Sequence, residues 1–103
     1  MTKYHRSYMP ISYRAAQTII KRGDEAALRT ALDQHLDPNL TNPNGWSLLM
    51  LAAVEGAVPL GRLLIERGAN PATPNAKGET PLTIATQKGH AAFVELLNEH
   101  AAR

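Results

Sequence analysis

The 103-residue chain contains no cysteine, so it forms neither a disulfide bond nor a thiolate metal site. Only five residues are aromatic, and leucine, isoleucine, valine and alanine must therefore fill the core. The longest unbroken apolar run, residues 48–54, is far shorter than a membrane span. The N-terminus also lacks the apolar stretch of a secretory signal. These absences predict one small, soluble domain in the cytoplasm, with no membrane contact; a mitochondrial presequence is the rival interpretation.

Acidic residues are missing from the first 22 positions. The net charge of the whole chain is only +2, too small to indicate nucleic-acid binding by itself. The basic end predicts a solvated tail or, less favoured, a contact with nucleic acid in which Tyr4 and Tyr8 stack on bases. The five basic residues of this segment are Lys3, Arg6, Arg14, Lys21 and Arg22.

The sequence repeats itself with a period of 33 residues. A shift of this length places Gly23, Gly56 and Gly89 in one column, and the leucine pair 63–64 over the pair 96–97. A fixed period of this length indicates a stack of similar units, each too small to bury its apolar face alone. About three such units are the practical minimum, which is the number present here.

Each unit is predicted to form a turn and two helices. In the second unit, turn residues 42–45 precede Ser47, whose hydroxyl suits a helix N-cap. An apolar helix follows over 48–54, and Gly56 ends it where a left-handed conformation is needed. Pro59 then falls near the start of the next helix, where its missing N–H costs nothing.

The other two units follow the same plan. In the third, Thr80 and Pro81 supply an N-cap and a first helical proline. The first unit is the most degenerate, with helices predicted over 13–21 and 25–34. We therefore predict an all-α solenoid. Its expected division is a basic tail over 1–11 and a repeat domain over 12–103, with repeats at about 12–40, 41–73 and 74–103.

The pattern resembles the ankyrin repeat. That family combines a turn glycine, Thr-Pro-Leu-His, an alanine pair, Gly-His, a leucine pair and Gly-Ala-Asp. Here residues 78–82 read Gly-Glu-Thr-Pro-Leu, residues 89–90 read Gly-His and residues 68–71 read Gly-Ala-Asn-Pro. The resemblance covers about 12–103. It implies stacked helix pairs whose turns project as fingers, and a protein-binding function.

The sequence departs from the family pattern at several positions, and each departure predicts a local difference in structure. Met50 and Thr83 replace the histidine that joins neighbouring repeats in the family. Gly61 lies inside a predicted helix, at a cost of about 1 kcal/mol relative to alanine, and is expected where a neighbouring helix approaches closely. The chain shows no polar capping repeat before residue 103. We therefore expect apolar surface near Phe93 and Leu97, covered by a partner or by a second copy.

The resemblance also implies a concave binding surface formed by the turns and the first helix of each repeat. Trp46, the single tryptophan, is expected to be either an anchor for a partner or a ring lying over neighbouring turns. The basic residues of this surface favour an acidic partner and a salt-sensitive association rate. The contact positions carried over are Tyr13, Lys21, Arg22, Pro43, Asn44, Trp46, Val54, Glu55, Ala76, Lys77, Glu79, Gln87 and Lys88.

Residue patterns that carry catalysis are missing. None of the four histidines pairs with another at metal-ligand spacing, and the glycines follow the repeat period instead of forming a phosphate loop. His90 matches the family's structural Gly-His position. We predict neither an enzyme nor a cofactor or metal site.

Four functions remain open at this point. The favoured one is an interaction module that blocks, sequesters or scaffolds a partner protein through the concave surface. A specific form of it is a bacterial immunity protein that neutralises a cognate toxin. The others are nucleic-acid binding through the basic N-terminal end and self-association through the C-terminal edge.

Overall fold

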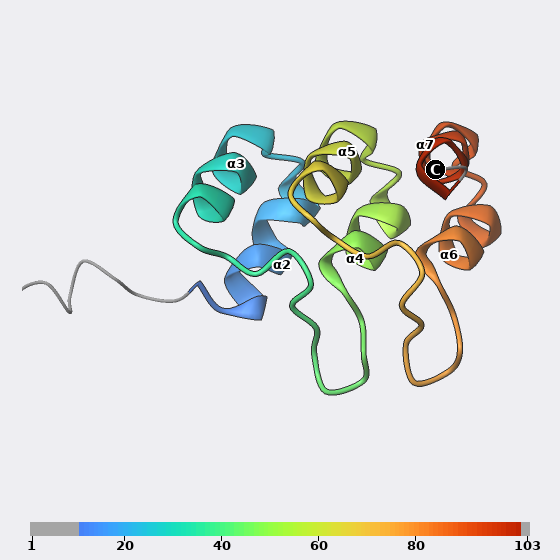
Figure 1. The fold of residues 1–103 in the computed structure, drawn as a ribbon, viewed down its shortest axis with the longest axis horizontal. Helices are drawn as coiled ribbons and strands as arrows, with labels where there is room; N and C mark the ends of the chain where they lie inside the picture. The colour runs from blue at the N-terminus through green and yellow to red at the C-terminus, as the bar shows by residue number, and fades with distance from the viewer. Residues whose placement is uncertain (1–10, 102–103) are drawn as a thin grey trace, which may run out of the picture.

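The computed structural model describes residues 11–101, so of the tail predicted over 1–11 only Ile11 lies within the described part. Three helix pairs follow one another along the longest axis, and the extents are 50 × 27 × 26 Å. The first helices form one layer and the second helices form the other (Figure 1). The predicted all-α fold is confirmed. The helices are α2 (Tyr13–Arg22), α3 (Glu25–Asp33), α4 (Leu48–Glu55), α5 (Val58–Glu66), α6 (Pro81–Lys88) and α7 (Ala91–Ala101).

Helix ends lie close to where the sequence places them, because local side chains determine them. Ser47 Oγ accepts a hydrogen bond from the Met50 N–H at 3.2 Å, and Thr80 Oγ1 accepts one from the Thr83 N–H at 3.3 Å. Gly56 ends α4 with a φ of 67°. In the first repeat α2 runs one residue further than predicted, to Arg22, and α3 ends one residue earlier, at Asp33.

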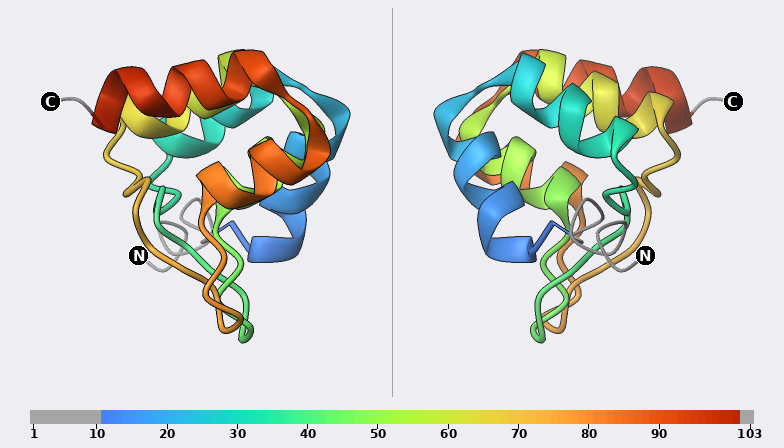
Figure 2. Two further views of the ribbon diagram at one scale, coloured as in Figure 1. Left: turned by 90° about the vertical axis from the view of Figure 1, so that its right-hand side faces the viewer. Right: turned by 90° about the vertical axis from the view of Figure 1, so that its left-hand side faces the viewer.

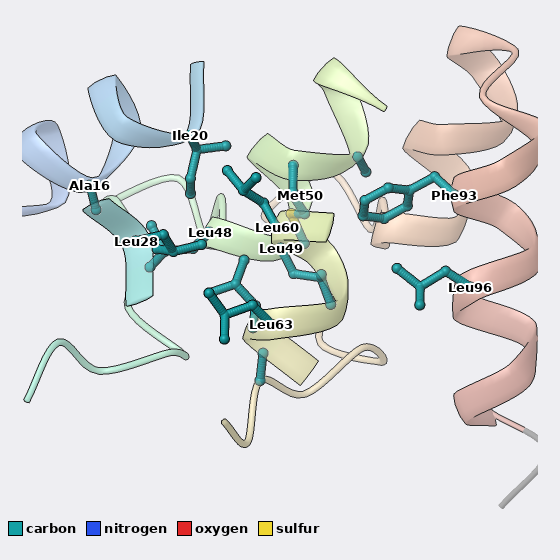
Figure 3. Packing of buried hydrophobic residues seen from close by; sticks show 14 of the residues in the cluster. Ala16, Ile20, Leu28, Leu48, Leu49, Met50, Leu60, Leu63, Phe93 and Leu96 are labelled. Carbon is teal, nitrogen blue, oxygen red and sulfur yellow. The ribbon is translucent and has the colours of Figure 1, made fainter. Parts of the chain in front are cut away.

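The core runs through all three repeats without a break. The middle repeat contributes most, with Leu48, Leu49 and Met50 of α4 at 0–1% exposure. Ile20 of the first repeat and Phe93 of the third point toward it from either side (Figure 3). Since each repeat buries residues against its neighbours, stability comes mainly from stacking.

The second and third repeats meet at two glycines. At Gly61 a Cβ atom would lie 2.6 Å from Phe93 Cε2, so the close helix approach predicted there is confirmed. At Gly56 a Cβ atom would lie 2.6 Å from Nδ1 of His90. The Nε2 atom of His90 lies 3.0 Å from the Val54 carbonyl oxygen and donates a hydrogen bond to it. His90 therefore has the structural role expected of it.

Asparagine and backbone groups also join neighbouring repeats. Asn39 donates from Nδ2 to the Gly68 carbonyl at 3.0 Å and accepts at Oδ1 from the Asn70 N–H at 2.7 Å. At the positions where the family has its linking histidine, Met50 is buried and the Thr83 hydroxyl lies 3.1 Å from that of Thr80 in the same repeat.

The side chains of Phe93 and Leu97 are themselves not part of the apolar surface that was expected around them. Phe93 is 0% exposed and Leu97 is 3% exposed. The reason is the rotation of α7 about its axis, which turns both side chains into the core shared with the rest of the stack. The large apolar side chain that is exposed in the described part of the chain is Leu82 of α6, at 40%.

Candidate protein-binding face

Two loops project beyond the first helices as fingers, which we define as residues 41–47 and 74–80 (Figure 1). A buried asparagine organises the second finger. Asn75, only 6% exposed, accepts at Oδ1 from the N–H groups of Lys77 (2.9 Å) and Glu79 (3.0 Å). Its Nδ2 donates to Glu79 Oε1 at 2.8 Å. This finger is thus held by its own side chains before any partner arrives.

The first finger uses the same device and packs against the second. Asn42 Oδ1 accepts from the N–H groups of Asn44 (3.0 Å) and Trp46 (2.9 Å). The Ala76 N–H donates to the Asn44 carbonyl at 2.9 Å, which joins the two fingers. Gly45 is required at this junction, because its φ is 81° and a Cβ atom would lie 3.1 Å from the Asn75 Cα atom.

Three predicted contact residues at equivalent repeat positions are half-buried instead of projecting freely. Trp46 packs against the hydrophobic core, and Glu79 is tied to Asn75. Tyr13 also packs against the core, and its buried hydroxyl has no hydrogen-bond partner in the described part of the chain. Burial raises the pKa of the Tyr13 phenol above its usual value of 10.0. These side chains therefore support the stack as well as bordering the candidate face.

The other predicted contact residues are exposed, except Val54, which is half-buried. Lys21 and Arg22 occupy the last turn of α2, where the helix dipole favours positive charge. Gln87 and Lys88 stand in the same place at the end of α6. The remaining ones are also exposed, and these are Pro43, Asn44, Glu55, Ala76 and Lys77.

A shallow groove of about 180 Å³ lies between α2 and α4. Half-buried Leu51 and Val54 provide apolar surface beside the buried Ile20. Lys21 and Glu55 place opposite charges on its rim, and Gln17 completes the lining. Such a groove can accept one apolar side chain while its rim orients a charged group beside it.

Besides the buried Ile20, two residues that line this groove, Gln17 and Leu51, are not among the contact positions predicted from the sequence. Gln17 precedes Lys21 by four residues and Leu51 precedes Val54 by three, the spacings that place side chains on one helix face. Helical periodicity applied to the carried-over positions would have found both.

Charged side chains on the opposite layer form ion pairs. Asp33 of α3 lies 2.9 Å from Arg67, which follows α5, and Arg62 of α5 lies 3.9 Å from Glu99 of α7. Pairs this exposed contribute at most about 1 kcal/mol each. Within residues 11–101, no group of three or more histidine, aspartate or glutamate side chains is arranged to hold a metal ion.

Comparison with known proteins agrees with this geometry. The family model for ankyrin repeats matches three copies over residues 13–103. The chain belongs to the ankyrin repeat family. Proteins built from ankyrin repeats are generally protein–protein interaction modules and typically not enzymes.

Several curated proteins contain similar ankyrin repeats. The chain is 37% identical over 78 residues to ankyrin repeat and SAM domain-containing protein 6 of Danio rerio, covering 75% of this chain and 11% of that protein. It is 43% identical over 78 residues to ankyrin repeat and KH domain-containing protein mask of Drosophila melanogaster, covering 74% and 2%. To potassium channel KOR1 of Oryza sativa subsp. japonica it is 34% identical over 80 residues, covering 78% and 9%.

The chain thus spans only 2–11% of the length of these relatives, so the similarity concerns the repeats they share. In the described part of the ankyrin chain, no helix has the length and apolar character needed to cross a membrane.

Proposed function

We propose that this ankyrin repeat protein binds a partner protein through a concave face made of the two fingers and the exposed sides of α2, α4 and α6. The groove between α2 and α4 supports this most directly. It offers apolar contact area at Leu51 and Val54 directly beside the charges of Lys21 and Glu55. Fingers already held by internal hydrogen bonds lose little conformational entropy on binding.

The charges of the concave face favour an acidic partner surface. Lys21, Arg22, Lys77 and Lys88 are exposed, whereas the carboxylate of Glu79 already accepts a hydrogen bond from its own finger. Among the predicted contact positions, the one exposed acidic residue is Glu55 on the groove rim. The partner would present acidic groups around an apolar side chain that enters the groove, and would associate more slowly at high salt.

Binding is then the function itself: the partner is blocked, sequestered or scaffolded. A cytoplasmic location belongs to the same proposal, since it rests on the sequence composition. The basic residues Lys3 and Arg6, on which a nucleic-acid contact would depend, lie outside the described residues.

The test is a pull-down from native lysate with matched charge reversals. The Lys21→Glu, Lys88→Glu double variant reverses two charges on the concave face. The Arg29→Glu, Arg62→Glu variant makes the same change in net charge on the layer of α3 and α5. Trp46 is avoided because it packs against the core, so its removal would alter stability together with binding.

A stoichiometric protein retained by the wild type and by the α3/α5 variant, but lost from the concave variant, supports the proposal. Retention by both variants, or loss from both at equal helicity, contradicts it. The captured protein, once purified, should bind at least tenfold more weakly to the concave variant, a loss of about 1.4 kcal/mol.

A further inference from the structure

The two ends of the repeat stack differ in polarity. In the third repeat, Ile84 and Leu96 are buried, at 2% and 1% exposure. Two periods earlier, at the N-terminal end of the stack, the equivalent residues are Thr18 and Thr30, and both are exposed. The Thr18 hydroxyl donates to the Arg14 carbonyl at 3.1 Å. Two of the positions through which a repeat contacts its predecessor are therefore polar at this end, and the small Ala27 stands at the position equivalent to Phe93.

The opposite end keeps an apolar surface. In the middle repeat, Leu49 and Ala53 are 1% and 0% exposed because the third repeat covers them. One period later, Leu82 is 40% exposed and Thr86 is exposed as well. Figure 2 (left) looks at this end, where no described element lies beyond α6 and α7. We call this surface, formed by the outer sides of α6 and α7, the end face.

The end face contains two shallow hollows. One, of about 420 Å³, lies between the end of α6 and the start of α7, and the other, of about 380 Å³, lies beside Leu82. Glu95 is the one aspartate, glutamate, lysine or arginine in the two linings. The first hollow is lined by Ala85, Thr86, Gly89, His90, Ala91, Val94 and Glu95, and the second by Pro71, Ala72, Thr80, Leu82, Leu97 and Asn98.

The first hollow repeats a site that is filled one repeat earlier. At Gly56 the imidazole of His90 occupies the space next to the glycine. At Gly89, one period on, no heavy atom of the described chain other than those of Gly89 and its two chain neighbours lies within 4 Å of the position of a Cβ atom. Gly23 is also open, because Ala57 stands one period before His90 and is too short to fill the space. The end face thus keeps the shape of an interior contact surface without an occupant in the described chain.

We propose that a second copy of this chain covers the end face, in a two-fold dimer that joins the two C-terminal ends. A head-to-tail stack would place the polar Thr18 and Thr30 against apolar hollows, so these described residues of the N-terminal end do not match the end face. A two-fold arrangement instead sets the exposed Leu82 of each copy against the apolar end face of the other. Because the hollows are lined by a single carboxylate residue, Glu95, their burial requires little desolvation of ions.

The area available predicts a weak dimer. Extents of 27 × 26 Å across the stack limit an end face to on the order of 600 Å² per copy, at the low end of stable interfaces. Interfaces of this size are typical of weak complexes, and we expect a dissociation constant on the order of 10–100 µM, about 5–7 kcal/mol. The concave face takes no part, so this inference stands apart from the proposed function.

The experiment measures mass against concentration by sedimentation equilibrium, from about 1 µM to 1 mM, a range that brackets the expected constant. Leu82→Glu introduces a charge at the exposed leucine of the end face without disturbing a buried residue. Val94→Glu is the second end-face variant, because Val94 is half-buried in the first hollow. Thr18→Glu is the matched control at the N-terminal end, and equal circular dichroism shows that each variant is folded.

The wild type and Thr18→Glu are expected to reach twice the monomer mass and no more. Leu82→Glu and Val94→Glu are expected to stay monomeric, with at least a tenfold higher dissociation constant. Wild-type monomer throughout the range overturns the proposal and leaves the end face to a different protein. Wild-type masses larger than the dimer would indicate head-to-tail stacking if Thr18→Glu abolishes them, and this result overturns the proposal too. A dimer that both Leu82→Glu and Val94→Glu retain also overturns it.

Discussion

The ring of Phe93 fills the space that a side chain at position 61 would need. With glycine there, α5 and α7 approach so closely that a Cβ atom on Gly61 would lie 2.6 Å from Phe93 Cε2 and 3.0 Å from Leu96 Cδ2. Both of these side chains are buried, at 0% and 1% exposure, and have little room to move aside.

Gly61→Ala is therefore expected to destabilise the protein, although alanine is the better helix former. The helical preference gains about 1 kcal/mol, whereas overpacking of a filled core costs about 1–3 kcal/mol. A net loss of about 1 kcal/mol should appear in urea unfolding. Thr30→Ala, on the exposed side of α3, is the control and should stabilise by a few tenths of a kcal/mol. A Gly61→Ala variant more stable than the wild type would show that the ring yields.

His90→Ala removes the hydrogen bond to the Val54 carbonyl and the imidazole beside Gly56. We expect a loss of about 1–2 kcal/mol in the free energy of unfolding. His90→Gln keeps an N–H donor on a side chain of similar length and should recover part of this loss. Equal unfolding midpoints for wild type and His90→Ala would mean that the contact contributes nothing to stability.

Asn75→Ala should loosen the second finger more than Asn42→Ala loosens the first. Asn75 is buried and makes three side-chain hydrogen bonds, whereas two backbone N–H groups donate to Asn42. A loss of about 2 kcal/mol is expected for Asn75→Ala. Amide hydrogen exchange at Lys77 and Glu79 should accelerate in that variant alone. Unchanged exchange at both amides would contradict the assigned role of Asn75.

Tyr13→Phe is expected to change the alkaline limit of stability. The raised pKa of the Tyr13 phenol means that the folded state holds its proton more tightly than the unfolded state. The stability that Tyr13 contributes through this pKa difference is therefore complete below the unfolded pKa of about 10. It declines as the pH rises from there through the pKa of the folded state. Thermal melts should show a smaller alkaline decline for Tyr13→Phe. At neutral pH the variant should equal or exceed the wild type, because it removes a buried hydroxyl without a partner.

Structural features that have a local cause could be predicted from the sequence. Ser47 and Thr80 cap their helices and Gly56 takes a positive φ, because each of these properties depends on one residue and the turn beside it. Because the sequence repeats every 33 residues, the helices and turns predicted for one repeat could also be predicted for the next. The close approach at Gly61 was predicted because glycine weakens an apolar helix unless a neighbouring element needs the space that a side chain would fill.

Features that depend on how one repeat is rotated against the next could not be predicted in this way. Apolar surface was expected around Phe93 and Leu97, yet α7 turns both side chains into the core, and the exposed apolar side chain is Leu82 of α6, in the same hollow as Leu97. Trp46 was equally compatible with a free anchor and with a packed ring, and in the fold it is half-buried against the core. No single repeat contains the information that decides between these outcomes.

One glycine joins the two helices of each repeat, and the three glycines have nearly the same backbone geometry. Their φ and ψ angles are 69° and 27° at Gly23, 67° and 26° at Gly56, and 76° and 23° at Gly89. The angle between the paired helices is thus fixed by the backbone, independently of the side chains displayed around it. The segment between two of these glycines, which contains a second helix, a finger and the next first helix, can in principle be exchanged for another, so that binding residues are grafted onto an unchanged frame.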